Sequence, residues 1–434
     1  MDLTIFHAGK GDCLLLRANG TNILVDGGMR NAYREHVAST LGALRSNGEE
    51  LDLLYVSHID QDHISGVLQL MDDELAWRVF RSQRGRAGGS RAREPRQPRP
   101  PKVRRLWHNA FKDQVDANAG EIEELLAANA TVLEMSNRQD LRDEATLQRE
   151  LAESVPEAIE LSERASPEQL GIPVNRQFDG RLALVRPSGR PVKVGAFQLT
   201  VIGPFSEDLD VLRKDWNKWL KTNREQLEDL RRRMREDAGR LRASELELVP
   251  PPLLEAASEL GDRSDVTPPN LASLMLLAEA DGRTVLLTGD GHAREIERGL
   301  KKAGRLDAQD QMHVDVLKVQ HHGAKANITE EFARAITADA YVFCGNGENG
   351  NPEPAVVDLI LDARLGTRSK SAAGPSKQFR LLFNSSMATE GKKHHQDHMA
   401  ALEKLVKRRA DRSDGRLKFS FASGSSFDLK LRRR

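Results

Sequence analysis

The chain has 434 residues, and its 65 basic side chains (Lys and Arg) equal its 65 acidic ones, so overall charge does not indicate a nucleic-acid partner. Aromatic residues make up only 5% of the chain, which argues against a stacking platform for single-stranded nucleic acid. Two distant cysteines argue against a disulfide framework. We see no signal peptide and no apolar run long enough to span a membrane, so we expect one or two large cytoplasmic domains.

The first elements form a strand-rich unit. Residues 3–7, 13–17 and 22–26 are expected to be strands, and Asn19-Gly20 predicts a hairpin turn between the last two. A helix over 31–46, ending near Asn47-Gly48, is followed by an apolar strand over 51–56. The next helix is expected to begin at Val67.

Four candidate metal ligands directly follow the strand over 51–56: His58, Asp60, Asp62 and His63. Imidazole and carboxylate together suit zinc, manganese or iron rather than calcium. Two carboxylates buried beside two imidazoles need a cation to offset their repulsion and desolvation. The pattern therefore predicts a hydrolytic site with two metal ions.

Residues 78–105 differ sharply in composition, with eleven Arg or Lys against one acid, Glu94, and several Pro and Gly. A solvated low-complexity loop is the simpler interpretation, and an arm for a phosphate backbone is the alternative. A strand ending at His108 is expected after this loop.

Two helical insertions are expected in the middle of the chain, an acidic one over 115–170 and a longer one over 207–247 whose apolar residues recur at three- and four-residue steps. The longer segment could pack on the body of the protein or serve a protein partner or a homodimer. Strands over 182–186 and 197–202 are expected to pair across Pro187-Ser188-Gly189.

Regular alternation of strands and helices returns near Asn270. Asp281-Gly282 predicts a hairpin between strands over 271–277 and 284–287. We expect further strands over 314–320, 339–344, 379–383, 417–421 and 427–431, and helices after His292 and over 329–337, 354–363 and 392–412.

Ligand-type residues recur at the ends of these strands, at Asp26, His58 to His63, His108, Asp290 and the pair His321-His322. In α/β folds that edge is where sites are built. Asp26 and His108 could instead be turn residues.

These motifs resemble the metallo-β-lactamase superfamily, and most of all the ComEC-type competence nuclease domain. Gly9-Lys10-Gly11-Asp12 and Asp26-Gly27-Gly28 are similar to its Gly-Gln-Gly-Asp and Asp-Gly-Gly motifs. His58-Ile59-Asp60-Gln61-Asp62-His63 is similar to His-x-His-x-Asp-His, and segments at 270–274, 286–290 and 317–323 are similar to later motifs. Asp60 departs from the pattern by replacing a histidine, which favours a harder metal such as manganese or iron.

The resemblance implies an α/β fold, the αββα sandwich, with large helical insertions. Its first half would span 1–77, and the basic loop 78–105. His108 with a helical insertion would span 106–180, core strands 181–204, the long insertion 205–267, and the second half with a basic tail 268–434.

The resemblance also assigns roles. One metal ion would be held by His58, Asp60 and His108, the other by Asp62, His63 and His322, and Asp290 would bridge them. The ions would be zinc or manganese, with iron as an alternative. We favour His322 over His321 as the ligand, because adjacent side chains on an extended backbone point opposite ways.

Other residues would support the chemistry. Asp26 and Asn270 would orient ligands, Asp62 would steer a metal-bridging hydroxide, and His321 would protonate the leaving group. Lys318 and Lys325 could neutralise a substrate phosphate.

The expected activity is a nuclease or phosphodiesterase acting on nucleic acid or a nucleotide-like phosphodiester, a choice favoured by the basic loop and the basic tail at 430–434. Two alternatives stay open. One is a superfamily hydrolase of a lactam, thioester or lactone, and the other is a regulatory protein that binds a partner through its helical insertions.

Overall fold

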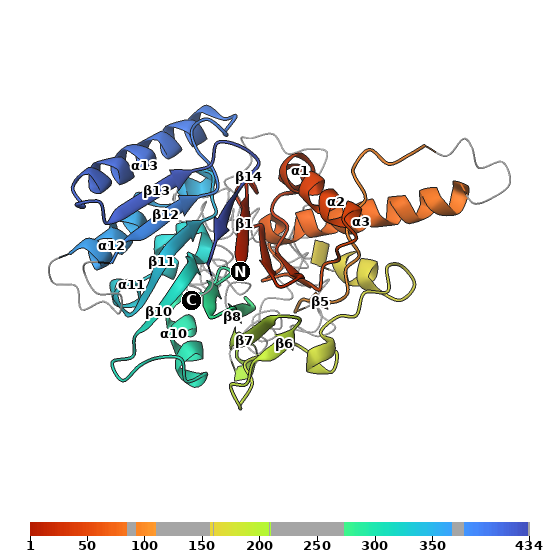
Figure 1. Ribbon diagram of the computed structural model, residues 1–434, viewed down its shortest axis with the longest axis horizontal. Helices are drawn as coiled ribbons and strands as arrows, with labels where there is room; N and C mark the ends of the chain where they lie inside the picture. The colour runs from red at the N-terminus through yellow and green to blue at the C-terminus, as the bar shows by residue number, and fades with distance from the viewer. Residues whose placement is uncertain are drawn as a thin grey trace, which may run out of the picture.

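The computed structural model describes residues 1–84, 93–109, 157–158, 160–207, 209, 273–366 and 377–432. These residues form two β-sheets that pack face to face, with helices on the outer face of each (Figure 1). The layers therefore follow the order helix, sheet, sheet, helix, as the sequence predicted.

The first sheet has six strands and is built from the N-terminal part of the chain plus one C-terminal strand. In spatial order they are β14 (Ser426–Lys430), β1 (Asp2–Phe6), β2 (Leu14–Ala18), β3 (Thr21–Val25), β4 (Leu53–Tyr55) and β5 (Leu106–Trp107). The predicted hairpin between β2 and β3 is confirmed: Asn19 and Gly20 both have positive φ, 46° and 76°, as a type I′ turn requires. From β3 to β5 the strands are parallel, so their carboxyl ends share one edge.

The second sheet has eight strands. In spatial order they are β13 (Leu417–Phe421), β12 (Phe379–Phe383), β11 (Ile336–Phe343), β10 (Met312–Lys318), β9 (Arg283–Leu287), β8 (Met275–Ala280), β7 (Phe197–Gly203) and β6 (Val192–Val194). From β9 to β13 all neighbours are parallel. The loops after β9 and β10 therefore leave the sheet at a common edge.

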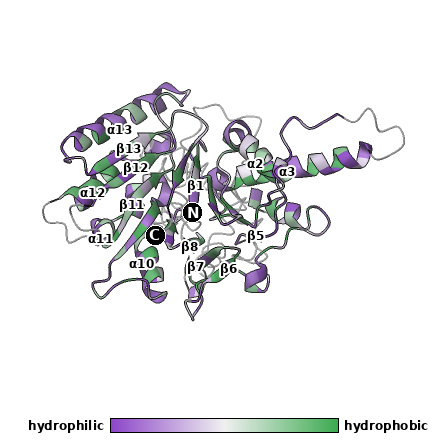
Figure 2. Cartoon of the chain, viewed as in Figure 1, coloured by the Kyte–Doolittle hydropathy of each residue, from purple (hydrophilic) through white to green (hydrophobic). Residues whose placement is uncertain are grey.

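Three apolar layers hold these elements together. The middle layer lies between the sheets and buries side chains such as Ile23, Tyr55, Trp107, Leu276 and Val316 completely. Figure 2 shows the contrast between apolar strands and the hydrophilic outward surface of α13. The sandwich is thus stabilised by burial on both faces of each sheet, which accounts for the continuous apolar runs in the strands.

Each outer face is covered by its own group of helices. On the first sheet lie α1 (Arg30–Ala32), a π-helical turn (Tyr33–Val37), α2 (Ala38–Ser46) and α3 (Gln61–Arg84). On the second lie α10 (Ala293–Lys302), α11 (Glu330–Ala335), α12 (Pro354–Leu365) and α13 (Lys393–Asp411). Among the described helices, none combines the length and apolarity that a membrane crossing needs.

Helix α3 differs from the prediction at both ends. It begins at Gln61, six residues before the predicted Val67, so Asp62 and His63 lie in its first turn. Its start follows from Asp60, whose carbonyl oxygen accepts hydrogen bonds from the His63 and Ile64 amides. At the other end it reaches Arg84, so residues 78–84 are helical and not part of a loop.

The second half of the predicted basic loop is also ordered by contacts. Pro98 packs directly against Gly42 of α2, and Arg99 forms an ion pair of 2.6 Å with Glu74 of α3. Arg104 pairs with Glu50. The prediction of a solvated loop over 78–105 is therefore wrong for 78–84, which are helical, whereas the described residues from 93 to 105 are mostly irregular and many of them are exposed.

The strand predicted over 182–186 is absent, because that segment is irregular. The hairpin partner of β7 is instead β6, and Val192 pairs with Leu199. Both Val192 and Val194 are buried between the sheets, and this burial stabilises β6, and not residues 182–186, as the partner of β7. The helical predictions for 115–170 and 207–247 fall almost wholly outside the described residues, apart from a short helical stretch ending at 165.

Candidate metal centre

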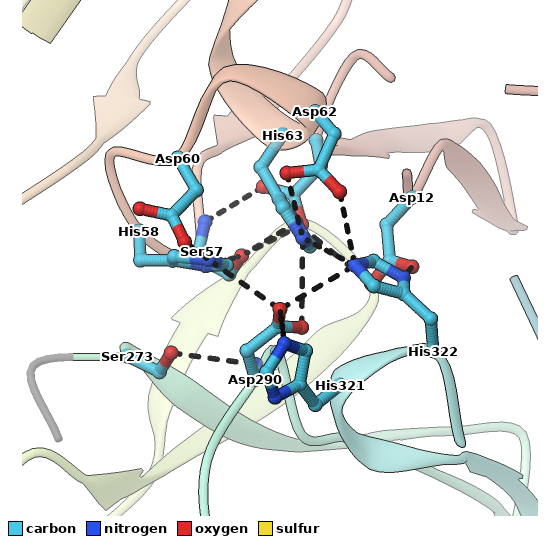
Figure 3. A network of polar contacts seen from close by, with 12 residues as sticks. Asp12, Ser57, His58, Asp60, Asp62, His63, Ser273, Asp290, His321 and His322 are labelled. Atoms are coloured by element: carbon cyan, nitrogen blue, oxygen red, sulfur yellow. Dashed lines mark hydrogen bonds and ion pairs between the residues drawn. The ribbon is translucent and has the colours of Figure 1, made fainter. Parts of the chain in front are cut away.

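Seven of the predicted site residues come together at the shared edge of the two sheets (Figure 3). The first sheet contributes the loop after β4 and the first turn of α3, and the second sheet contributes the loops after β9 and β10. The seven are His58, Asp60, Asp62, His63, Asp290, His321 and His322. Residues more than 200 positions apart in the sequence are thus adjacent, because the loops after β4, β9 and β10 lie at the same edge of the sandwich.

Two close backbone approaches fix the first turn of α3 in this position. The Gly27 amide donates to the His63 carbonyl oxygen at 2.8 Å, and a Cβ atom at Gly66 would lie 2.0 Å from the Gly27 carbonyl oxygen. A Cβ atom at Gly11 would lie 1.7 Å from the Asp62 carbonyl oxygen. Glycine is therefore required where the Asp-Gly-Gly and Gly-x-Gly-Asp loops touch the helix that carries Asp62 and His63.

Asp26 contacts His63, and this contact fits the orienting role that the resemblance implies for Asp26. Its fully buried carboxylate accepts hydrogen bonds from the Ser57 amide (2.7 Å) and the Ser57 hydroxyl (2.8 Å). Its Oδ2 lies 3.0 Å from Nδ1 of His63. With Nδ1 held by a carboxylate, Nε2 is the nitrogen of His63 that faces the centre.

Asp12 makes an equivalent contact with His322, a role that was not predicted from the sequence. Its Oδ1 lies 3.2 Å from Nδ1 of His322, and its Oδ2 contacts the ammonium group of Lys318. Because both carboxylate oxygens are engaged in this way, we interpret Asp12 mainly as a group that orients His322. The signal for it in the sequence was the Gly-Lys-Gly-Asp motif, which places a carboxylate at the end of a glycine-rich loop.

The two oriented histidines direct their Nε2 atoms at a common point. These atoms are 3.3 Å apart, and Nε2 of His322 lies 3.1 Å from Oδ2 of Asp62. Asp290 approaches both rings, at 3.5 Å from Nε2 of His63 and 3.4 Å from Nε2 of His322. One potential ligand atom from each of Asp12, His63, Asp290 and His322 lies within 4.8 Å of the others.

A second group of ligand-type side chains lies on the other side of Asp290 (Figure 3). Nε2 of His58 is 3.4 Å from Oδ2 of Asp60 and 3.6 Å from Oδ2 of Asp290. Its Nδ1 is 3.0 Å from the Ser57 hydroxyl. Asp290 therefore lies between two ligand groups, which is the arrangement that a bridging carboxylate requires.

His321 and His322 differ in depth. The His322 side chain is almost completely buried, whereas that of His321 is 24% exposed, with Nε2 at 3.7 Å from Asp290 and Nδ1 at 2.7 Å from Oδ1 of Asn327. The reason given for preferring His322 was wrong in one respect. Both residues have left-handed backbone conformations, with φ of 45° and 55°, and are not extended.

His108 lies at the same sheet edge, one residue beyond β5 and beside the strand that leads to His58. Asn175 fixes its backbone through two hydrogen bonds, of 3.1 and 2.8 Å. Burial lowers the pKa of His108 to about 4, so the ring is neutral at pH 7 and able to donate a lone pair. Neither ring nitrogen of His108 makes a hydrogen bond to the described residues, and its role as a ligand stays a prediction.

The remaining predicted residues have different outcomes. Asn270 lies outside the described residues. Lys325 is exposed near the mouth of the site, where its amide donates to Glu353. Lys318 is buried and faces carboxylates rather than solvent, so the structure does not support a phosphate-binding role for it. Lys430, at the start of the basic tail, is also remote, because it pairs with Asp2 at the opposite edge of the first sheet.

The electrostatics of the centre are dominated by its carboxylates. Burial alone would lower the pKa of His63 and His322, but Asp290 and neighbouring carboxylates raise both well above the ordinary histidine value. Burial likewise would raise the pKa of Asp62 and Asp290, and the histidines lower both. Such a set of carboxylates attracts cations strongly.

The residues present fit divalent cations. Nε2 of His58, Oδ1 of Asp60 and Oδ1 of Asp290 are buried and make no hydrogen bond to any of the described residues. Both ring nitrogens of His108 are in the same situation. Buried polar atoms without hydrogen bonds are costly, and coordination of a cation would satisfy them.

Two of the comparisons with known proteins gave matches. The family model described as "Metallo-beta-lactamase superfamily" matches residues 8–74, the part of the chain from the Asp12 loop to the first half of α3. One solved structure found is the metallo-beta-lactamase fold protein YhfI from Bacillus subtilis. It is 10% identical, with 99% of this chain and 98% of that chain covered and a TM-score of 0.36. The comparison with curated proteins gave no match.

Proposed function

We propose that this protein is a hydrolase of the metallo-beta-lactamase type that uses two divalent metal ions. The observation that carries the proposal is the pair of ligand groups on either side of Asp290, with three buried ligand atoms that make no hydrogen bond among the described residues. The match of residues 8–74 to the superfamily supports it independently.

Each ligand group would hold one ion. His63, His322 and Asp62 form one group, and His58 with Asp60 forms the other. His108 would complete the second group. Divalent ions bound there would activate a water molecule near neutral pH and polarise the bond to be cleaved.

Two residues at the mouth would handle protons. Asp62 is 13% exposed and its Oδ2 faces His322, which suits it to orient an attacking water molecule. His321 is more exposed, and its Nδ1 is held by Asn327, so Nε2 is directed at Asp290 and the site. We assign His321 to protonation of the leaving group.

Within this class we propose a phosphodiester substrate. The centre is rich in carboxylates, and Asp60 stands where the superfamily motif has a histidine, which favours hard cations with affinity for phosphoryl oxygens. Lys10 helps to lower the pKa of Asp62, but its Nζ is 4.0 Å from Glu348, so it gives no separate support for an anionic substrate. Lys430 of the basic tail gives no support, because it lies at the opposite edge of the first sheet.

A substrate panel with purified, metal-analysed protein tests the proposal. We expect close to two divalent ions per chain and metal-dependent cleavage of DNA, RNA or bis-p-nitrophenyl phosphate. His322→Ala should abolish both metal binding at one position and turnover. His313→Ala is the matched control, because His313 lies at the opposite end of β10 and pairs with Asp339.

The panel also separates the alternatives. Cleavage of nitrocefin, a thioester or a lactone without phosphodiester cleavage would assign the protein to another branch of metal-dependent hydrolases. A protein that binds no divalent ion would contradict the proposal as a whole.

A further inference from the structure

Lys318 is the one lysine whose ammonium group is buried inside the candidate metal centre, as far as the described residues extend. It is the last residue of β10 and is 1% exposed. A buried lysine needs specific partners, because desolvation of an ammonium group is costly. Its partners therefore indicate why the chain keeps a charge at this position.

All of those partners belong to the centre. The ammonium group contacts Oδ2 of Asp12, lies 3.5 Å from Oδ1 of Asp290 and donates to the Gly289 carbonyl oxygen at 3.0 Å. Burial would lower the pKa of the amine, but Asp12 and Asp290 raise it above its ordinary value, so the side chain is charged. The contact with Asp12 comes from the first sheet and the contact with Asp290 from the second.

The contact with Asp12 also extends to His322. One oxygen of Asp12 meets Lys318 and the other lies 3.2 Å from Nδ1 of His322. If Lys318 did not hold Oδ2, the carboxylate could rotate away from the ring. Lys318 thus acts on the orientation of His322 through an intervening carboxylate.

Lys318 also balances part of the negative charge of the centre. Five carboxylates contribute to the centre and its surroundings: Asp12, Asp26, Asp60, Asp62 and Asp290. Two divalent cations would neutralise four of them, and one ammonium group neutralises the fifth. Without Lys318, these carboxylates would repel one another more strongly and would need bound metal to stay close together.

We propose that Lys318 is a positioning residue with the role of an internal counter-ion: it keeps Asp12 and Asp290 together before metal binds and orients His322 through Asp12. This inference rests on the proposed metal centre. The inference goes beyond the proposed metal centre, because it assigns the assembly of the centre to a side chain of the protein and not to the metal alone.

Thermal unfolding of four proteins tests the inference, each measured with a chelator and with saturating Zn²⁺ or Mn²⁺. They are the wild type, Lys318→Met, Asp12→Asn and the double variant. In chelator, Lys318→Met should lower Tm by about 5–10 °C, because it leaves a buried carboxylate unpaired. Saturating metal should raise the Tm of Lys318→Met by more than it raises the Tm of the wild type.

The double variant keeps the test decisive if a single variant does not fold. It replaces the Lys318–Asp12 pair by a neutral pair of similar size but still leaves Asp290 without the ammonium group, so its loss of Tm in chelator should be smaller than the sum of the two single losses. Lys418→Met, on the exposed face of β13, is the matched control and should change Tm little in either condition.

Two results would overturn the inference. One is an equal loss of Tm for Lys318→Met with and without metal, which would mean that the lysine is only a packing residue. The other is additive losses for the two single variants. Metal content of the wild type is measured separately, so absence of metal would refute the proposed function and would be distinguishable from either result.

Discussion

Replacement of Asp26 by Asn gives the sharpest test of how the centre is built. The carboxylate is fully buried and touches no predicted metal position directly, yet it accepts from the Ser57 amide and hydroxyl and lies 3.0 Å from Nδ1 of His63. Asn keeps the shape and tolerates the backbone, because Asp26 has a φ of 55° and Asn adopts the left-handed region readily. The substitution therefore removes mainly the charge that holds His63.

The expected cost follows from that single contact. A hydrogen bond to a charged acceptor contributes about 1.5–3 kcal/mol. Loss of a carboxylate behind a ligating histidine lowers metal affinity by roughly 10–100-fold, which corresponds to about 1.4–2.7 kcal/mol. We therefore expect Asp26→Asn to bind its more weakly held ion roughly 10–100-fold less tightly.

Competition with a chelator of known affinity measures this change. Asp315→Asn is the matched control, because Asp315 is also buried and accepts from Thr284 and Arg283, but at the opposite end of the second sheet. It should lower thermal stability and leave metal affinity unchanged. An Asp26→Asn protein whose metal affinity stays within about threefold of the wild type would refute the reasoning.

Three further predictions follow from the geometry. Asp60→His should shift the bound metal toward zinc, and unchanged metal content by elemental analysis would argue against Asp60 as a ligand. Metal affinity should rise with pH above the ordinary histidine pKa, because His63 and His322 have raised pKa values and must lose protons to bind metal. Calorimetry in buffers of different ionisation enthalpy should detect that proton release, and pH-independent binding between pH 6 and 9 would contradict it. Gly66→Ala should lower Tm and metal content together, because the new Cβ would lie 2.0 Å from the Gly27 carbonyl oxygen, whereas a normal Tm would refute the contact.

The elements that the sequence predicted well are those with local causes. Asn19-Gly20 specifies its hairpin because the turn itself demands two positive φ values, and neighbouring strands then follow. The strands that lead to His58, Asp290 and His321 were likewise predicted, because each combines an apolar run with an abrupt change to His or Asp.

The errors have causes that are not local. The sequence predicts a turn over His58 to His63 and a helix from Val67, whereas the helix begins at Gln61, where the Asp60 carbonyl oxygen accepts its first hydrogen bonds. The close packing of Gly66 on Gly27 holds this first turn in place. Strand β6 was missed because only its burial between the sheets, and not its three-residue length, identifies it. The role of Asp12 depends on a contact with His322, 310 residues away, that no spacing rule contains.

The division of the ligands between the two sheets has a kinetic consequence. His58 and His63 belong to the first sheet and its helix, whereas Asp290 and His322 follow strands of the second. An ion held by both sets would act as a crosslink between the halves of the sandwich. It could form only after the sheets have docked, so it would contribute little to the rate of folding. Its main effect would be to slow the separation of the sheets, and bound metal would then determine the lifetime of the native state more than the rate at which it is reached.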